Sequence, residues 1–209
     1  DGREYAMDAY FDEDGEPVIL SVLEHLFASK DDASDRVYIT SAEIVLENME
    51  RFTQHLRDLG QVFDVQHMPV HVEVRIDAAG RVFPIEVNPM RFGGWCTTAD
   101  LTHHAFGVNP YACYFRSETP DWNEVLKQDE GDVFALIALG NSTGVDGADV
   151  DSFDHDAFVA RFSHPLELRK TDFRRYPIFG FLFTRTGRDQ LGELDFALRS
   201  DLREFITQA

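Results

Sequence analysis

The sequence predicts an α+β protein in which an antiparallel sheet packs against helices, with a small α/β extension at the C-terminus. Three observations support this prediction. Apolar and polar residues alternate in short runs, as at Val72, Val74 and Ile76, which is typical of strands with one buried face. Turn residues such as those at 77–80 separate neighbouring runs. Elsewhere, apolar residues recur every three or four positions, which indicates amphipathic helices.

The first organised region is a hairpin over residues 5–26, and a long helix follows it. Ser41 or Thr40 can cap the start of this helix, and Gly60 can end it in the left-handed conformation. The spacing predicts a buried face formed by Val45, Met49, Phe52, Leu56 and Leu59. We therefore expect these residues to be core.

A second hairpin covers residues 71–88, and a helix over 98–106 stops at Gly107. The residues at 117–120 then break the pattern. We place a domain boundary there, which gives one domain over residues 1–117 and an appended α+β region over residues 118–209.

The appended region begins with an apolar strand at 132–139, followed by a loop rich in Gly and Asp. The acidic residues of this loop do not match the spacing of helix-loop-helix calcium sites, so we expect a solvated loop. A short helix over 154–162, strands at 165–170 and 178–184, and a terminal helix over 191–206 complete the predicted elements.

Composition excludes several classes of protein. Nineteen Lys and Arg against 38 Asp and Glu give a formal charge of −19, which argues against nucleic acid or an anionic membrane as partner. No apolar run reaches membrane-spanning length, and we expect a cytoplasmic protein. Eighteen Phe rule out a disordered tail, and a Phe-rich C-terminal face would allow a homo-oligomer. Cys96 and Cys113 lack C-x-x-C spacing and are predicted to be small buried thiols.

The second hairpin carries a set of oxygen ligands. Glu86 and Asn88 are two residues apart, so the pleat of a strand directs both to one face. Pairing across the turn brings Glu73 close to them. Two carboxylates and an amide oxygen suit magnesium that also binds substrate phosphates. The alternative interpretation is an ordinary hairpin with a polar face.

The residues after this strand are suited to an anion. Pro89 ends the strand, and Arg91 then supplies a cation. Gly93 and Gly94 allow backbone amides to approach a bound anion closely.

These motifs together resemble the second half of the ATP-grasp ligases, particularly the carboxylate–amine ligase branch. The resemblance rests on a Glu-bearing strand, an acidic turn with Gly, the run I-E-V-N-P at 85–89 and the Arg-Gly-Gly loop. Glu73 and Glu86 are 13 residues apart, the spacing of that branch between its two metal carboxylates. Residues 2–16 resemble the family's G-x-E-y-x-v-D strand and hairpin return. One departure is Met90, which precedes Arg91 where the family commonly has Arg directly after Asn-Pro.

The resemblance implies an ATP- and Mg-dependent ligase that joins a small-molecule carboxylate to an amine through an acyl phosphate. It implies that Glu73, Glu86 and Asn88 hold magnesium, and that Glu4 lies near the ribose hydroxyls of ATP. It further implies that Arg91, with the amides of Gly93 and Gly94, receives the acyl phosphate.

The family's glycine-rich loop and phosphate-binding lysine would lie upstream of this sequence, so we expect the isolated chain to be an inactive fragment. Three alternatives stay open at this point. The chain could be a non-catalytic nucleotide-binding module, a protein-interaction module, or an ATP-grasp kinase that stops after phosphoryl transfer.

Overall fold

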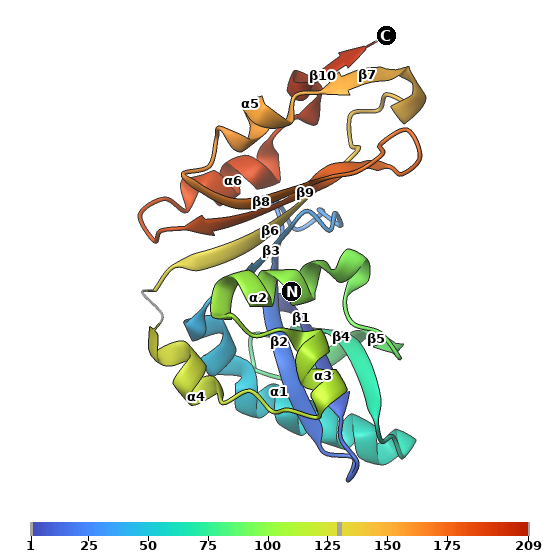
Figure 1. Cartoon of the computed structure of the whole chain (residues 1–209), viewed down its shortest axis with the longest axis vertical. Helices are drawn as coiled ribbons and strands as arrows, with labels where there is room; N and C mark the ends of the chain where they lie inside the picture. Colours follow the sequence, from blue (N-terminus) through green and yellow to red (C-terminus); the bar gives the residue numbers. More distant parts are fainter. Residues whose placement is uncertain (1, 129–130, 209) are drawn as a thin grey trace. The chain divides into compact units, whose positions relative to one another are not determined.

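The computed structural model describes residues 2–128 and 131–208 (Figure 1). These residues form two compact units. Unit 1 comprises Asp1–His25 and Ile39–Gly131, and unit 2 comprises Leu26–Tyr38 and Asp132–Ala209. These units are defined by how the residues pack. The predicted domain boundary between residues 117 and 118 stays a prediction.

The sheet of unit 1 is antiparallel, with strands in the order β5-β4-β1-β2. Its strands are β1 (Arg3–Phe11), β2 (Pro17–Leu26), β4 (Met68–Ile76) and β5 (Val82–Pro89). β1 lies between β2 and β4 and is buried at every residue after Arg3. Both predicted hairpins are confirmed, with turns where the sequence places them. This central strand therefore has two covered faces, one apolar and one largely polar.

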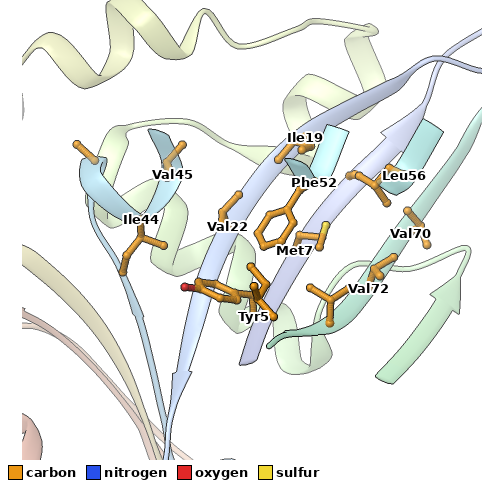
Figure 2. Packing of buried hydrophobic residues seen from close by; sticks show 14 of the residues in the cluster. Tyr5, Met7, Ile19, Val22, Ile44, Val45, Phe52, Leu56, Val70 and Val72 are labelled. Atoms are coloured by element: carbon orange, nitrogen blue, oxygen red, sulfur yellow. The ribbon is translucent and has the colours of Figure 1, made fainter. Parts of the chain in front are cut away.

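The apolar face packs against helix α1 (Ala42–Phe63). Tyr5 and Met7 of β1 point into this core, where they meet Phe52 of the helix (Figure 2). The rings of Tyr5 and Phe52 make an edge-to-face contact with centroids 5.5 Å apart. The predicted helix face is confirmed: Val45, Phe52 and Leu56 are buried, and Met49 and Leu59 pack against them.

The start of α1 is as predicted, but its predicted end is wrong. The Ser41 side chain accepts a hydrogen bond from the Ile44 amide at 3.2 Å, as an N-cap does. The helix continues past Gly60 to Phe63, and Asp64 adopts the left-handed conformation with φ of 50°. Gly60 instead allows close packing, because a Cβ there would lie 2.6 Å from the Phe11 ring. The glycine is therefore required by the core and not by the helix end.

Three further helices belong to unit 1. They are α2 (Thr97–Phe106), α3 (Pro110–Arg116) and α4 (Trp122–Val125). α2 ends at Gly107 with φ of 69°, as predicted, whereas α3 and α4 were not predicted. α2 and α3 cover the face of the sheet opposite α1 (Figure 1). The short 3-10 turn Gly94–Cys96 leads into α2.

Unit 2 contains the antiparallel strands β6, β9 and β8 in that order. They span Val133–Gly140, Ile178–Thr186 and His164–Lys170, close to the predicted strands. β7 (Val150–Phe153) pairs with β10 (Ile206–Gln208), and neither was predicted. The helix predicted over 154–162 is shorter, at His155–Val159 in α5. β3 (Val37–Thr40) has residues in both units.

The single terminal helix predicted over 191–206 is wrong. Helix α6 covers only Gly192–Arg199, and a 3-10 turn at Leu202–Phe205 follows it. The Arg36 guanidinium donates hydrogen bonds to three carbonyl oxygens at the end of α6, the shortest of them 3.0 Å to Ser200. A cation on these carbonyls satisfies groups that a continuing helix would use, so the helix stops there.

The α+β class with an antiparallel sheet is confirmed. Within residues 2–128 and 131–208, no helix combines the length and the hydropathy needed to cross a bilayer.

Two phenylalanines of α1 provide a matched test of the core. Phe52 is fully buried, whereas Phe63 is 67% exposed. We expect Phe52→Ala to lower the free energy of unfolding by about 3–5 kcal/mol, because it removes apolar contacts and leaves a cavity. Phe63→Ala should change it by less than about 1 kcal/mol. Urea unfolding followed by circular dichroism measures both, and equal losses would contradict this description of the core.

Candidate functional site

Polar side chains gather on the face of the unit 1 sheet opposite α1. In β1, even-numbered residues point to this face while Tyr5 and Met7 point into the core. In β4, the odd-numbered residues point to this polar face, because the even-numbered Val72 and Val74 point into the core. The charged or amide side chains on this face are Glu4, Asp8, His71, Glu73, Arg75, Glu86 and Asn88.

The three predicted metal ligands lie together. Glu73 is the direct cross-strand partner of Glu86, and Asn88 is the partner of His71. The Asn88 amide nitrogen donates a hydrogen bond to Glu86 Oε1 at 2.5 Å. The register therefore places two carboxylates and an amide on neighbouring positions of β4 and β5, as the sequence predicts.

Two like charges directly opposite each other destabilise a sheet unless a cation compensates them. Arg91 approaches Glu86, with Nη2 3.7 Å from Glu86 Oε1, and His71 approaches Glu73, with Nε2 3.3 Å from Glu73 Oε1. The side chains of Glu73 and Glu86 are 21% and 51% exposed, so both carboxylates are open to an ion from solvent. A hydrogen bond from His71 lowers the pKa of Glu73, which keeps it ionised.

This donor set fits magnesium. Among residues 2–128 and 131–208, no three His, Cys, Asp or Glu side chains form a metal cluster by themselves. Magnesium needs fewer protein ligands, because it is usually bound through one or two carboxylates together with phosphate oxygens and water. Glu73 and Glu86, with the Asn88 amide oxygen, are the residues that would hold it.

Behind these ligands lies a buried carboxylate that sequence reasoning missed. Asp8 has no exposed surface. Its Oδ1 accepts a hydrogen bond from the Gly93 amide at 2.9 Å and lies 2.8 Å from His71 Nδ1. Its Oδ2 accepts a hydrogen bond from the Thr98 hydroxyl. His71 Nε2 in turn lies 3.3 Å from Glu73 Oε1.

His71 is an imidazolium held between two carboxylates. Burial by itself would lower the pKa of His71, but the hydrogen bonds with Asp8 and Glu73 outweigh burial and raise it to about 9. Both ring nitrogens therefore carry protons at neutral pH, and each donates to one carboxylate.

The loop after β5 brings part of the predicted anion site into place. Arg91 donates to the Phe92 carbonyl oxygen at 3.0 Å and approaches Glu86. The Gly93 amide is bonded to Asp8, so in this conformation it does not face a ligand. Gly94 has open space around its Cα. The predicted roles of Arg91, Gly93 and Gly94 at an acyl phosphate stay predictions.

Glu4 is buried, and both of its carboxylate oxygens already have partners. Oε1 lies 3.1 Å from His25 Nδ1, and Oε2 accepts a hydrogen bond from Arg75 at 2.5 Å. Its predicted place near a ribose stays a prediction. The prediction that Cys96 is buried is wrong: its thiol is exposed and accepts a hydrogen bond from the Tyr111 hydroxyl at 3.2 Å, because Cys96 sits in a left-handed turn at the start of α2.

The sequence carries a signal for the residues that were missed. Asp8 lies four residues after Glu4, and His71 lies two before Glu73, so the strand period places each pair on one face. A carboxylate at Asp8 in an otherwise apolar part of a strand is the feature that points to a buried polar contact.

Gly93 and Gly94 differ in the space around them. A Cβ at Gly93 would lie 2.3 Å from Thr98 Oγ1, whereas a Cβ at Gly94 would meet nothing within 4 Å. We expect Gly93→Ala to displace Thr98 and lower the free energy of unfolding by about 1–3 kcal/mol, while Gly94→Ala should change it by less than about 1 kcal/mol. Chemical denaturation compares the two variants, and equal stability would contradict the packing described here.

The raised pKa of His71 predicts a pH dependence of stability. The pKa of His71 is about 9 in the folded state and 6.5 in the unfolded chain. Its contribution to stability is therefore complete below pH 6.5 and is lost as the pH rises through 9. Urea unfolding between pH 6.5 and 9.5, without divalent metal, should show stability falling by at most about 1.4 kcal/mol per pH unit. His71→Gln removes the titrating group, so its stability should fall less over this range. An equal fall in the variant would contradict the assignment.

The chain was compared with known proteins. The family model of the ATP-grasp domain matches residues 1–99. No curated protein sequence matches the chain. Among solved structures, L-amino acid ligase from Bacillus licheniformis is similar with a TM-score of 0.68 and 17% identity, over 100% of this chain and 54% of that one.

Two synthetases are also similar. N5-carboxyaminoimidazole ribonucleotide synthetase from Thermotoga maritima has a TM-score of 0.63 and 16% identity, over 98% of this chain and 52% of that one. Phosphoribosylglycinamide synthetase from Anaerococcus prevotii has a TM-score of 0.61 and 14% identity, over 100% of this chain and 53% of that one. The chain spans about half the length of these proteins. The match to the ATP-grasp domain model covers slightly less than half of the chain, and the fold of the chain is similar to that of these ligases and synthetases.

Proposed function

We propose that the protein containing this chain is an ATP- and Mg-dependent ligase that joins a small-molecule carboxylate to an amine. In the first step, a carboxylate oxygen of the substrate attacks the terminal phosphorus of ATP, and ADP leaves. In the second step, the amine nitrogen attacks the carbonyl carbon of the acyl phosphate, and inorganic phosphate and a proton are released. The product is an amide.

The observation that carries this proposal is the opposition of Glu73 and Glu86 across β4 and β5, with Asn88 beside them. Two carboxylates facing each other on a sheet destabilise the pairing of the strands, and a bound cation would relieve this repulsion. A bound magnesium would act as a Lewis acid and neutralise the negative charge on the phosphate oxygens, as phosphoryl transfer requires. Glu73, Glu86 and Asn88 would hold it from the protein side.

Arg91 extends this set toward the reacting groups. Its guanidinium is 45% exposed and approaches Glu86, so its remaining donors can reach an anion next to the metal ligands. In the proposed function it stabilises the negative charge of the acyl phosphate and of the tetrahedral intermediate that the amine forms. The Gly94 amide, three residues further along the loop, adds a neutral donor in this proposal.

The match of residues 1–99 to the ATP-grasp domain model supports ATP as the nucleotide. The named neighbours include an amino acid ligase and a glycinamide synthetase, which supports a carboxylate and an amine as the substrate classes. Because the chain spans about half the length of these neighbours, the proposal concerns the full-length protein that contains it.

Titration of Mg-ATP and Mg-ADP into the full-length protein by calorimetry tests the proposal. We expect binding by the wild type, and we expect Glu86→Gln to lower ligase turnover by more than about 100-fold, because it removes a metal carboxylate. Its thermal unfolding temperature should fall little, since Glu86 is half-exposed.

Glu50→Gln provides the control, because Glu50 is an exposed residue of α1, away from the polar face, and the charge change is the same. This variant should bind Mg-ATP as the wild type does. Near-normal turnover by Glu86→Gln, or absence of Mg-nucleotide binding by the wild type, would refute the proposed function.

A further inference from the structure

We propose that Asp8 is a positioning residue that couples the two halves of the site, acting on Glu73 through His71 and on the Arg91–Gly94 loop directly. This inference rests on the proposed function, because it concerns residues that would hold magnesium and the acyl phosphate. It assigns a role to a carboxylate that touches neither of them.

Asp8 has no exposed surface, so its charge has no water to solvate it. A buried carboxylate is tolerated only where hydrogen bonds and opposite charge replace the lost water. Asp8 has three such partners, His71, Gly93 and Thr98. They come from three different segments, so the carboxylate links those segments together.

Asp8 is connected to the proposed metal ligand Glu73 through His71. Asp8 and His71 are direct cross-strand partners between β1 and β4. With Nδ1 held by Asp8, the ring of His71 cannot turn, and its Nε2 faces Glu73. Groups that hold a metal ligand in one orientation typically change metal affinity by 10–100-fold when removed. Here the chain of contacts is one step longer, from Asp8 through His71 to Glu73.

Asp8 also contacts the Arg91–Gly94 loop and the start of helix α2. The Gly93 amide and the Thr98 hydroxyl both donate to Asp8, one to each oxygen. Gly93 packs so closely against Thr98 that there is no room for a side chain between them. The loop that carries Arg91 is therefore bound to Asp8 at Gly93, while Arg91, at the start of the loop, approaches Glu86.

Through these contacts, the Asp8 carboxylate holds both Glu73, by way of His71, and the Arg91–Gly94 loop in position. A displacement of Asp8 moves both. A purely structural carboxylate would stabilise the fold without affecting metal binding, and this difference can be measured.

Two threonines of α2 give a matched pair of variants. Thr98 donates to Asp8, and Thr102, one turn further along, donates to the Ser21 hydroxyl at 2.8 Å. Both side chains are buried, so Thr98→Val and Thr102→Val each remove one buried hydroxyl from the same helix. His71→Asn keeps a donor near the Nδ1 position and loses the contact with Glu73.

The experiment measures binding of Mn²⁺, as a probe for magnesium, to the full-length protein with ADP by electron paramagnetic resonance. We expect His71→Asn to raise the Kd for Mn²⁺ about 10-fold, and Thr98→Val to raise it about 3-fold through the loosened Asp8. Thr102→Val should leave it unchanged. Thermal unfolding measured in parallel should show a larger loss of stability for Thr98→Val than for Thr102→Val, because Thr98→Val leaves a buried carboxylate with one donor fewer.

The outcomes separate the two proposals. Wild-type protein that binds Mn²⁺ with ADP, together with a His71→Asn variant of unchanged Kd, would overturn the positioning role and leave the proposed function standing. Equal Mn²⁺ Kd values for Thr98→Val and Thr102→Val would also overturn it. Failure of the wild type to bind Mn²⁺ with ADP would refute the proposed function and this inference with it.

Discussion

The buried carboxylate of Asp8 is the interaction on which the polar face of unit 1 depends. A charge without solvent is costly, and here three donors from β4, the loop after β5 and helix α2 compensate it. Losing one donor would leave a buried charge with incomplete solvation, which costs more than the lost bond itself is worth. The position of each donor is therefore fixed by the need to satisfy Asp8. This constraint gives the loop after β5 a defined place next to the sheet.

The period of the strands explains how one sheet supports both a core and a site. Tyr5 and Met7 alternate with Glu4 and Asp8 along β1, so apolar and charged side chains leave the strand on opposite sides. Helix α1 covers the apolar side, and burial of the apolar side chains between helix and sheet stabilises unit 1. The polar side is then free to hold an unfavourable arrangement, with Glu73 opposite Glu86. The stability of the core offsets the repulsion that the site requires.

The sequence predicts the strands and the convergence of Glu73, Glu86 and Asn88, because a period of two residues and a tight turn determine which side chains share a face. It predicts the end of α2 at Gly107, but not the ends of α1 and α6, which depend on distant contacts. Gly60 looks like a helix stop but fits under the Phe11 ring, and α6 ends early where Arg36 binds its carbonyls. The role of Asp8 was missed for the same reason, since its partners lie 63 to 90 residues away in the sequence.

Met90 shows how a departure from the family pattern is accommodated. An extra residue between Asn-Pro and Arg would shift the guanidinium by one position if the strand simply continued. Met90 instead adopts a left-handed conformation with φ of 62°, and its side chain is 80% exposed. Its amide still donates to the Pro69 carbonyl oxygen at 2.8 Å, so the pairing with β4 is kept up to this point. The chain then turns, and Arg91 approaches Glu86. The insertion is absorbed in the backbone at one exposed residue, which is why the cation and the carboxylate can meet despite it.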